Sequence, residues 1–319
     1  MQADIDGAVR SARLAANFSW TWNPDDVSRF CDVAEWRLAE PSVRPRLLTN
    51  LEIAEPIGHV SIGRNIWSDE ASSQVLRQIS FRLSSSGSGS VSASERIDAF
   101  FLAGSRLTSE FGNPTQAIPG REPTLAWELP ELSIELRLRA SYLVLGIINP
   151  NYQDWKNSSR DELEYERRLN HGDEKPNDSV SPSSTLGWQS FLSALSLTLS
   201  RLPEDGVLTI VADSKKWVRF SFGESSRLGL LLRCEFPQIG DMDAEQLVRD
   251  GWVKPDKRSR HWVYAVEWPT IYDKYYALSK SAVGVLRSIF GVEDVASISI
   301  DSQSLSYGDH ADLVAFREG

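Results

Sequence analysis

Cysteine and histidine, the residues that most often reveal a metal site or a nucleophile, are scarce in this chain. Its 319 residues include two cysteines, Cys31 and Cys234, and four histidines. Two cysteines so far apart form neither a disulfide framework nor a zinc site. We therefore expect both to be buried free thiols in a reducing compartment.

Long apolar runs are absent as well. No segment approaches the ~20 apolar residues that span a bilayer. The first residues, MQADIDGAVR, lack the basic and apolar regions of a signal peptide. We therefore expect a cytoplasmic protein that does not insert into a membrane.

Motifs that carry catalysis or phosphate binding are also missing. The chain has no G-x-S-x-G nucleophile elbow, no Walker A sequence and no G-x-G-x-x-G after a strand. The one local cluster with metal-ligand chemistry is Asp309, His310 and Asp312, and no second cluster with ligand spacing supports it. The sequence therefore predicts no catalytic residue, no metal and no cofactor.

The charge balance is acidic. Forty-four Asp and Glu against 34 Lys and Arg give a formal net charge of −10. Nucleic-acid-binding domains are normally basic, so we expect no nucleic-acid partner. One short segment does combine cations with aromatic rings that could stack on bases, and we interpret it as a turn between a helix and a strand: Trp252, Lys254, Lys257, Arg258, Arg260, Trp262.

A polar stretch over residues 155–185 divides the chain. Apolar periodicity stops there, and Asp, Glu, Asn, Ser, Pro and Arg take over. Such a composition buries too little apolar surface to offset the entropy lost on ordering. We therefore predict an N-terminal domain over 1–154, a linker over 155–185, a second domain over 186–306 and a tail over 307–319.

The first half shows helical and strand patterns in turn. Asn23 and Pro24 indicate a helix start, and Gly112 indicates the end of a second helix. Residues 84–95 have the composition of a flexible loop. We predict helices over 25–36 and 94–111, and strands over 47–55, 58–67, 74–83, 124–129, 132–138 and 142–148.

The second half has a similar inventory. Asp243 is the predicted cap of a short helix that ends at Gly251, and Gly291 is the predicted end of a long helix from 271. A first helix over 188–202 and strands over 207–213, 216–223, 227–236 and 261–268 complete the unit, and 297–301 is a last strand or an extended tail. The predicted fold class is α+β, with two tandem domains, each an antiparallel meander sheet with helices packed on one face.

The second half resembles a known family. It opens a helix with Trp188, turns at Asp250-Gly251-Trp252 and ends a helix with the segment LRSIFGV over 286–292. These features resemble the actinobacterial TY-Chap domain, which joins YbjN-like proteins with type III secretion chaperones. The resemblance covers about 184–306 and implies a secretion-chaperone-like fold.

The first half resembles an uncharacterised actinobacterial domain that accompanies such units. The features that carry this resemblance are Phe18-x-Trp20-x-Trp22, the Trp36 corner and FGNPT over 111–115. Together the two resemblances imply a non-enzymatic protein-binding module. Its role would be that of a chaperone, adaptor or immunity-like protein for a secreted or toxin-like client, one encoded nearby, and the family supplies no catalytic residues to transfer.

Aromatic side chains are the candidate contacts for such a client, because 11 tryptophans is a high count and large amphipathic rings anchor interfaces. In the strand KWVRFSF, one alternating set of side chains must face the core, so the other would belong to a binding face. The sequence does not say which set is exposed. The candidates are Trp217, Phe220, Phe222, Trp262 and Trp268.

Two alternatives stay open at this point. In the first alternative, the chain is an enzyme of unrecognised class with a cleft between its halves. Its candidate polar groups would be Glu235, Asp241, Asp243 and His261. In the second alternative, it is a structural homo-oligomer, such as a homodimer, that uses the same surfaces for self-association. A deep polar pocket would favour the enzyme, a broad apolar groove the binding module, and light scattering would identify the oligomer.

Overall fold

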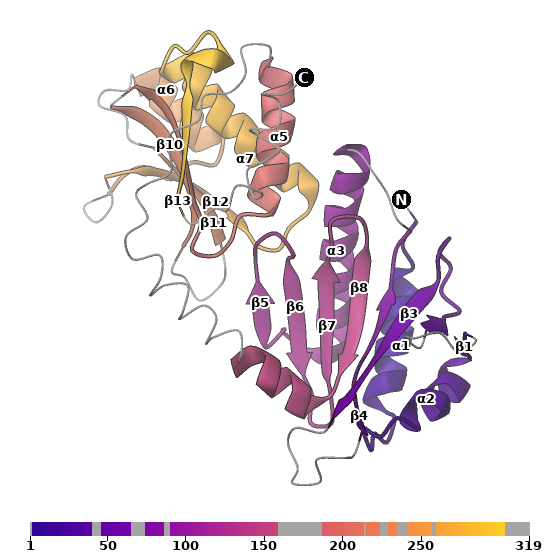
Figure 1. Ribbon diagram of the computed structural model, residues 1–319. Coiled ribbons are helices and arrows are strands. Elements are labelled where there is room, and N and C mark those ends of the chain that lie inside the picture. The colour runs from indigo at the N-terminus through magenta and orange to yellow at the C-terminus, as the bar shows by residue number, and fades with distance from the viewer. Residues whose placement is uncertain are drawn as a thin grey trace. The chain divides into compact units, whose positions relative to one another are not determined.

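The computed structural model describes residues 2–39, 46–64, 74–85, 90–158, 187–213, 215–223, 229–234, 241–256 and 260–303. The chain forms two compact units. The N-terminal unit comprises residues 1–118 and 122–173, and the C-terminal unit comprises residues 119–121 and 174–319. Each unit has an antiparallel sheet with helices (Figure 1), which confirms the predicted α+β class.

The N-terminal unit is built on an eight-stranded sheet with the strand order β1-β2-β3-β4-β8-β7-β6-β5. Two meanders, β1 to β4 and β5 to β8, are joined by pairing of β4 with β8, and all neighbours are antiparallel. The strands are β1 (Arg37–Leu38), β2 (Arg46–Leu48), β3 (Ile57–Arg64), β4 (Gln74–Arg82), β5 (Gln116–Ile118), β6 (Thr124–Glu128), β7 (Ser133–Leu138) and β8 (Leu143–Ile148).

Three helices pack on one face of this sheet: α1 (Ile5–Ala16), α2 (Asp26–Ala34) and α3 (Ser90–Phe111). The helix α1 packs on α3, α3 packs on β7 and β8, and α2 packs on β4 (Figure 1). Alternate side chains of the strands fill the space beneath them, and Phe81, Leu136 and Ile147 are almost inaccessible. Burial of each such side chain contributes about 1.5–3 kcal/mol.

The N-terminal aromatic motif is half-buried and packs against the edge of this core. The Trp20 and Trp22 rings stack with centroids 4.6 Å apart, and Phe30 lies 5.2 Å from Trp20. The row of ring contacts continues from Phe30 to Trp36, with centroids 5.4 Å apart, and from Trp36 to Phe81, with centroids 4.8 Å apart. The motif therefore joins the first turns of the unit to its central strand.

A buried carboxylate holds the turn that carries these rings. Asp26 is inaccessible to solvent, and its Oδ2 accepts hydrogen bonds from the backbone N–H groups of Thr21 and Trp22, both at 2.7 Å. Arg29 forms an ion pair with the same side chain. These bonds stabilise Trp22 at its positive φ of 58°, a conformation that non-glycine residues rarely adopt.

Three predictions for this unit were wrong. The helix α1 was missed although its amphipathic pattern is as strong as that of α2, and its buried face consists of small residues, Gly7, Ala8, Ala12 and Ala15. The helix α3 begins at Ser90, inside the segment expected to be a loop. The strand expected over 47–55 ends at Leu48.

The predicted linker over 155–185 begins inside a helical stretch over 150–158, and from residue 159 on it lies outside the described residues.

The C-terminal unit has a five-stranded antiparallel sheet with the order β12-β11-β10-β9-β13. Its strands are β9 (Val207–Asp213), β10 (Lys216–Phe222), β11 (Gly229–Cys234), β12 (Trp262–Glu267) and β13 (Ser299–Gln303). Helix α5 (Trp188–Ser200) packs on α7 (Tyr272–Gly284), which continues as a π-helical turn over Val285–Ile289. Helix α7 contacts β12, and the π-helical turn contacts β10, so both lie on one face of the sheet (Figure 1).

The helix ends of this unit confirm two glycine predictions and correct one cap. Gly251 and Gly291 have φ values of 94° and 73°, the left-handed conformation that ends a helix. Helix α6 (Asp241–Arg249) begins two residues before Asp243, so Asp243 lies in the first turn and is not the cap. The segment predicted as a last strand or an extended tail is a strand, because β13 pairs with β9.

Candidate functional site

The predicted contact residues lie on opposite faces of the C-terminal sheet. Phe220, Trp262 and Trp268 are buried, with 0, 5 and 7% of their surfaces exposed. Phe222 is half-buried and meets the Trp268 ring edge-on at 6.4 Å. These side chains therefore fill the core beneath α5 and α7. Trp217 belongs to the alternate set on β10 and points to the other face.

We call this other face the open face. Strand register places on it Thr209 and Val211 of β9, Trp217, Arg219 and Ser221 of β10, Leu231 and Arg233 of β11, Val263 and Ala265 of β12, and Asp301 of β13. An antiparallel sheet commonly leaves one face without a covering layer. Apolar and polar side chains are mixed on it, so it is not a purely hydrophobic surface.

Trp217 is the main aromatic side chain of the open face. It is half-buried, and its ring meets the His261 ring at 5.4 Å in a T-shaped contact. The Arg219 guanidinium carbon lies 5.0 Å from the Trp217 ring centroid, a cation–π distance. The two contacts restrain the indole, and part of its surface stays exposed.

Two arginines stand directly opposite each other beside this tryptophan. Arg219 and Arg233 are cross-strand partners on β10 and β11. Arg219 Nε donates to Thr209 Oγ1 at 3.1 Å, and Arg233 Nη1 donates to Ser221 Oγ at 2.6 Å. Both acceptors are neutral hydroxyls. Among the described residues, neither guanidinium forms an ion pair with a carboxylate, Asp301 of the same face included.

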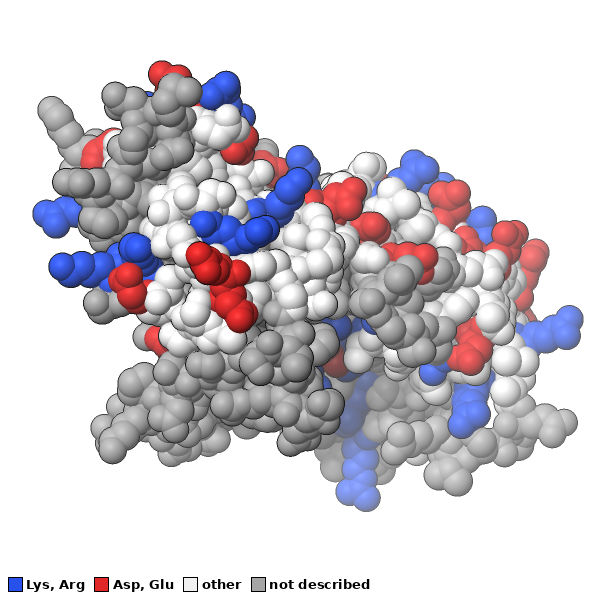
Figure 2. Space-filling view, turned by 90° about the horizontal axis from the view of Figure 1, so that it is seen from above, with Lys and Arg blue, Asp and Glu red and all other residues white. Residues whose placement is uncertain are grey.

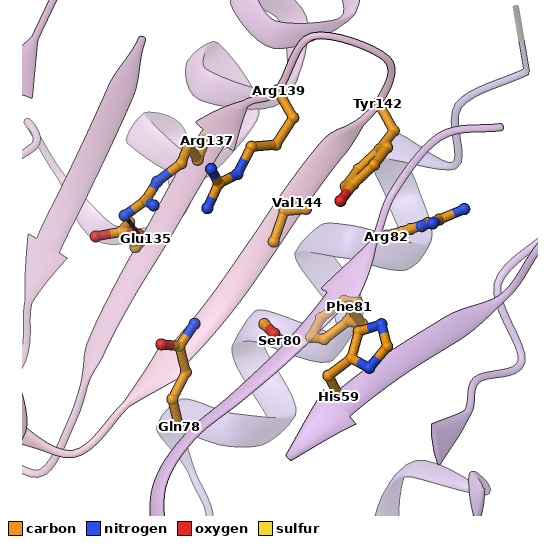
Figure 3. Close-up of a pocket in the computed structure, with 10 residues that line it drawn as sticks. All are labelled: His59, Gln78, Ser80, Phe81, Arg82, Glu135, Arg137, Arg139, Tyr142 and Val144. Atoms are coloured by element: carbon orange, nitrogen blue, oxygen red, sulfur yellow. Dashed lines mark hydrogen bonds and ion pairs between the residues drawn. The ribbon is translucent and has the colours of Figure 1, made fainter. Parts of the chain in front are cut away.

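A second feature, in the N-terminal unit, is a hollow of about 120 Å³ on the face of the eight-stranded sheet opposite α1, α2 and α3. Its lining comes from β3, β4, β7, β8 and the β7–β8 turn: His59, Gln78, Ser80, Phe81, Arg82, Glu135, Arg137, Arg139, Tyr142 and Val144. Figure 3 shows Val144 between these side chains, with the Arg139 side chain and the Tyr142 hydroxyl reaching toward it from the turn. Sequence reasoning missed this hollow because strands distant in sequence build it.

The cations of this hollow have anionic partners within the same unit. Arg137 pairs with Glu135, whose side chain is only 7% exposed, and Lys156 Nζ lies 2.7 Å from the same carboxylate. Arg139 pairs with Glu122. Arg82 pairs with Glu55 and lies 4.3 Å above the Tyr142 ring. The positive charges around the hollow are therefore largely neutralised by glutamates of the same unit.

The polar residues of the enzyme hypothesis are not assembled into a site by the described residues. Glu235 lies outside them, as does the cluster over 309–312. Asp241 and Asp243 lie in the first turn of α6, and His261 packs on Trp217. No group of His, Cys, Asp and Glu side chains in the described ranges has the arrangement of a metal site.

Both cysteines are buried, as expected, with one in each unit. Burial raises the pKa of the Cys31 thiol to about 11 and raises the pKa of Cys234 further. A thiol in such surroundings stays protonated near neutral pH and is a poor nucleophile. Neither cysteine is therefore a candidate catalytic group.

Charges on the surface are distributed in small groups. On the face drawn in Figure 2, basic and acidic side chains lie between uncharged ones, and no single sign covers the described part of it. No helix in the ranges that the structure describes is both long and apolar enough to cross a membrane.

Comparison with known families matches each half of the chain separately. Residues 6–147 match a family of unknown function, DUF6301. Residues 181–304 match TY-Chap3, the family described as T3SS (YopN, CesT) and YbjN peptide-binding chaperone 3. The resemblance drawn from Trp188, the Gly251 corner and the 286–292 segment is thereby confirmed, as is the two-part arrangement. No curated protein and no solved structure matches the chain.

Proposed function

We propose that this protein is a non-enzymatic peptide-binding chaperone or adaptor, which holds a segment of a protein client on the open face of its C-terminal sheet. The observation that carries the proposal is the match of residues 181–304 to a peptide-binding chaperone family. The same residues contain a sheet with helices on one face and an accessible tryptophan on the other.

The physical argument for the open face rests on Trp217. Aromatic side chains that combine an apolar ring with a polar atom dominate the energetics of protein interfaces. Trp217 is already held by His261 and Arg219. A client therefore binds a ring with little conformational freedom left to lose, which lowers the entropic cost of association.

The finer parts of the proposal concern the client. We propose a secreted or toxin-like protein encoded near this one, because the matched family is described by type III secretion chaperones. Self-association through the same face is the competing arrangement. Size-exclusion chromatography with light scattering would identify it as a dimer of this chain.

The test is capture of a client by tagged full-length protein in its native host, with wild type compared to Trp217→Ala. Trp155→Ala is the matched control, because Trp155 is a 44% exposed tryptophan of the N-terminal unit. We expect wild type and Trp155→Ala to retain one protein in stoichiometric amount, and Trp217→Ala to lose it at unchanged far-ultraviolet circular dichroism. Equal capture by all three proteins contradicts the open face as the binding site.

A further inference from the structure

We infer that the bound segment is acidic and that Arg219 and Arg233 select it through its carboxylates. This inference rests on the proposed function and adds the chemistry of the client. It starts from the cross-strand arginine pair, a feature to which neither the family match nor the aromatic contacts assign a role.

Two like charges directly opposite each other on neighbouring strands destabilise a sheet. Arg219 and Arg233 are such a pair. Within the described ranges their hydrogen-bond acceptors are the hydroxyls of Thr209 and Ser221, which do not offset the charge. An arrangement that is unfavourable in the free protein becomes favourable when an anion lies between the two guanidinium groups.

The donors of the two guanidinium groups are suited to carboxylates. Each guanidinium has five N–H donors in a planar fork, and the structure uses one of them on each arginine. The other donors can bind the two oxygens of a carboxylate side by side, which gives a strong and directional contact. The cation–π contact with Trp217 also restrains the Arg219 side chain, which lowers the entropic cost of binding a ligand.

The spacing indicates the pattern of the ligand. Directly opposite residues of an antiparallel pair have Cα atoms about 4.5–5.5 Å apart. Side chains on one side of an extended peptide are about 6.6–6.8 Å apart, because they alternate and each residue rises about 3.3–3.4 Å. Two acidic residues separated by one position can therefore reach both arginines, with an apolar neighbour near Trp217.

The experiment uses the full-length protein and three synthetic peptides that share one extended apolar framework. Two positions, separated by one residue, carry Glu in the first peptide, Gln in the second and Lys in the third. Affinities are measured by fluorescence anisotropy for wild type, the double variant Arg219→Gln/Arg233→Gln, the charge-preserving Arg219→Lys/Arg233→Lys and the control Arg249→Gln. Arg249 is an exposed arginine of α6.

For wild type, we expect the Glu peptide to bind about tenfold more tightly than the Gln peptide and the Lys peptide to bind more weakly than both. The double glutamine variant should bind the Glu and Gln peptides equally, the double lysine variant should keep part of the preference, and Arg249→Gln should behave as wild type. Added salt should weaken binding of the Glu peptide more than binding of the other two peptides.

The outcomes separate the two claims. If Glu and Gln peptides bind wild type equally, or if the preference survives in the double glutamine variant, the acidic selection is wrong while peptide binding stands. If none of the peptides binds at any concentration tested, the proposed function is contradicted and the inference falls with it. Circular dichroism of each variant shows whether a loss of binding comes from unfolding.

Discussion

In each unit, one face of the antiparallel sheet lies opposite the packed helices α1 to α3 or α5 and α7, and the arginines of these two faces differ in what they contact. In the N-terminal unit, Arg137, Arg139 and Arg82 are paired with glutamates of the same unit. In the C-terminal unit, Arg219 and Arg233 have only hydroxyl acceptors among the described residues. The number of arginines on a sheet face therefore says little about binding. What matters is whether carboxylates of the same unit already neutralise them.

The largest expected effect comes from breaking the arginine–glutamate pairs on the face of the N-terminal sheet that carries the hollow. Glu135→Gln removes the nearly buried carboxylate that Arg137 and Lys156 share. Loss of one partner of a buried ion pair costs about 3–5 kcal/mol, and partial exposure of the two cations should bring the loss to about 2–3 kcal/mol. Urea denaturation followed by amide hydrogen exchange in the N-terminal unit measures it.

The matched control for that variant is Glu122→Gln. Glu122 is 41% exposed and pairs with Arg139 at the edge of the hollow. Exposed ion pairs contribute little, so this variant should change the stability of the unit much less. An equal loss from both substitutions would mean that burial of Glu135 does not matter to the pairing.

The two buried thiols offer a second comparison between the units. The native pKa of Cys31 is raised from 9.0 to about 11, and that of Cys234 is raised further. Above pH 9 the unfolded chain loses thiol protons that the native state keeps, so stability should fall as pH rises from about 9 to 11. Both Cys→Ala substitutions together should reduce this fall, which denaturation at several pH values would measure.

Alkylation followed by mass spectrometry distinguishes the two sites. Cys31 should react at a lower pH than Cys234, whereas in denaturant both should react alike. Reaction of Cys234 first in the native protein would contradict the order of the two pKa values.

The smallest expected effect comes from giving the open face an arginine–glutamate pair like those of the N-terminal sheet. Arg219→Glu places a carboxylate opposite Arg233 and replaces a like-charge pair by an opposite one. Such cross-strand pairs contribute about 0.2–1 kcal/mol, so the C-terminal unit should become slightly more stable. The same variant should lose the preference for acidic peptides. Arg249→Glu is the control, and equal stabilisation by it would show that only the net charge matters.

Much of the fold could be predicted because the strongest patterns coincide with the strongest burial. The alternation in β7 and the glycines at 251 and 291 gave elements that the structure confirms. Helix α1, whose packing surface consists of alanines and a glycine, was missed although its amphipathic pattern is as strong as that of α2. The prediction looked for large apolar side chains, and close approach of backbones provides the packing of small ones.

The candidate site was predictable only in part. Alternation in β10 shows that Trp217 and Phe220 lie on opposite faces, but both are apolar, so nothing local says which one the helices cover. The pairing of Arg219 with Arg233 depends on the register between β10 and β11, which a single sequence does not fix. The glutamate partners in the hollow depend in the same way on strands distant in sequence.

The central position of β8 in its sheet has a consequence for synthesis of the protein. The meander β1 to β4 leaves the ribosome first, and the edge of β4 stays unpaired while α3, β5, β6 and β7 are translated. An unpaired apolar edge strand is a template for wrong pairing and aggregation. We therefore expect newly made N-terminal units to pass through a stage in which they are themselves aggregation-prone, and it ends only when residues 144–148 emerge and pair with residues 78–82.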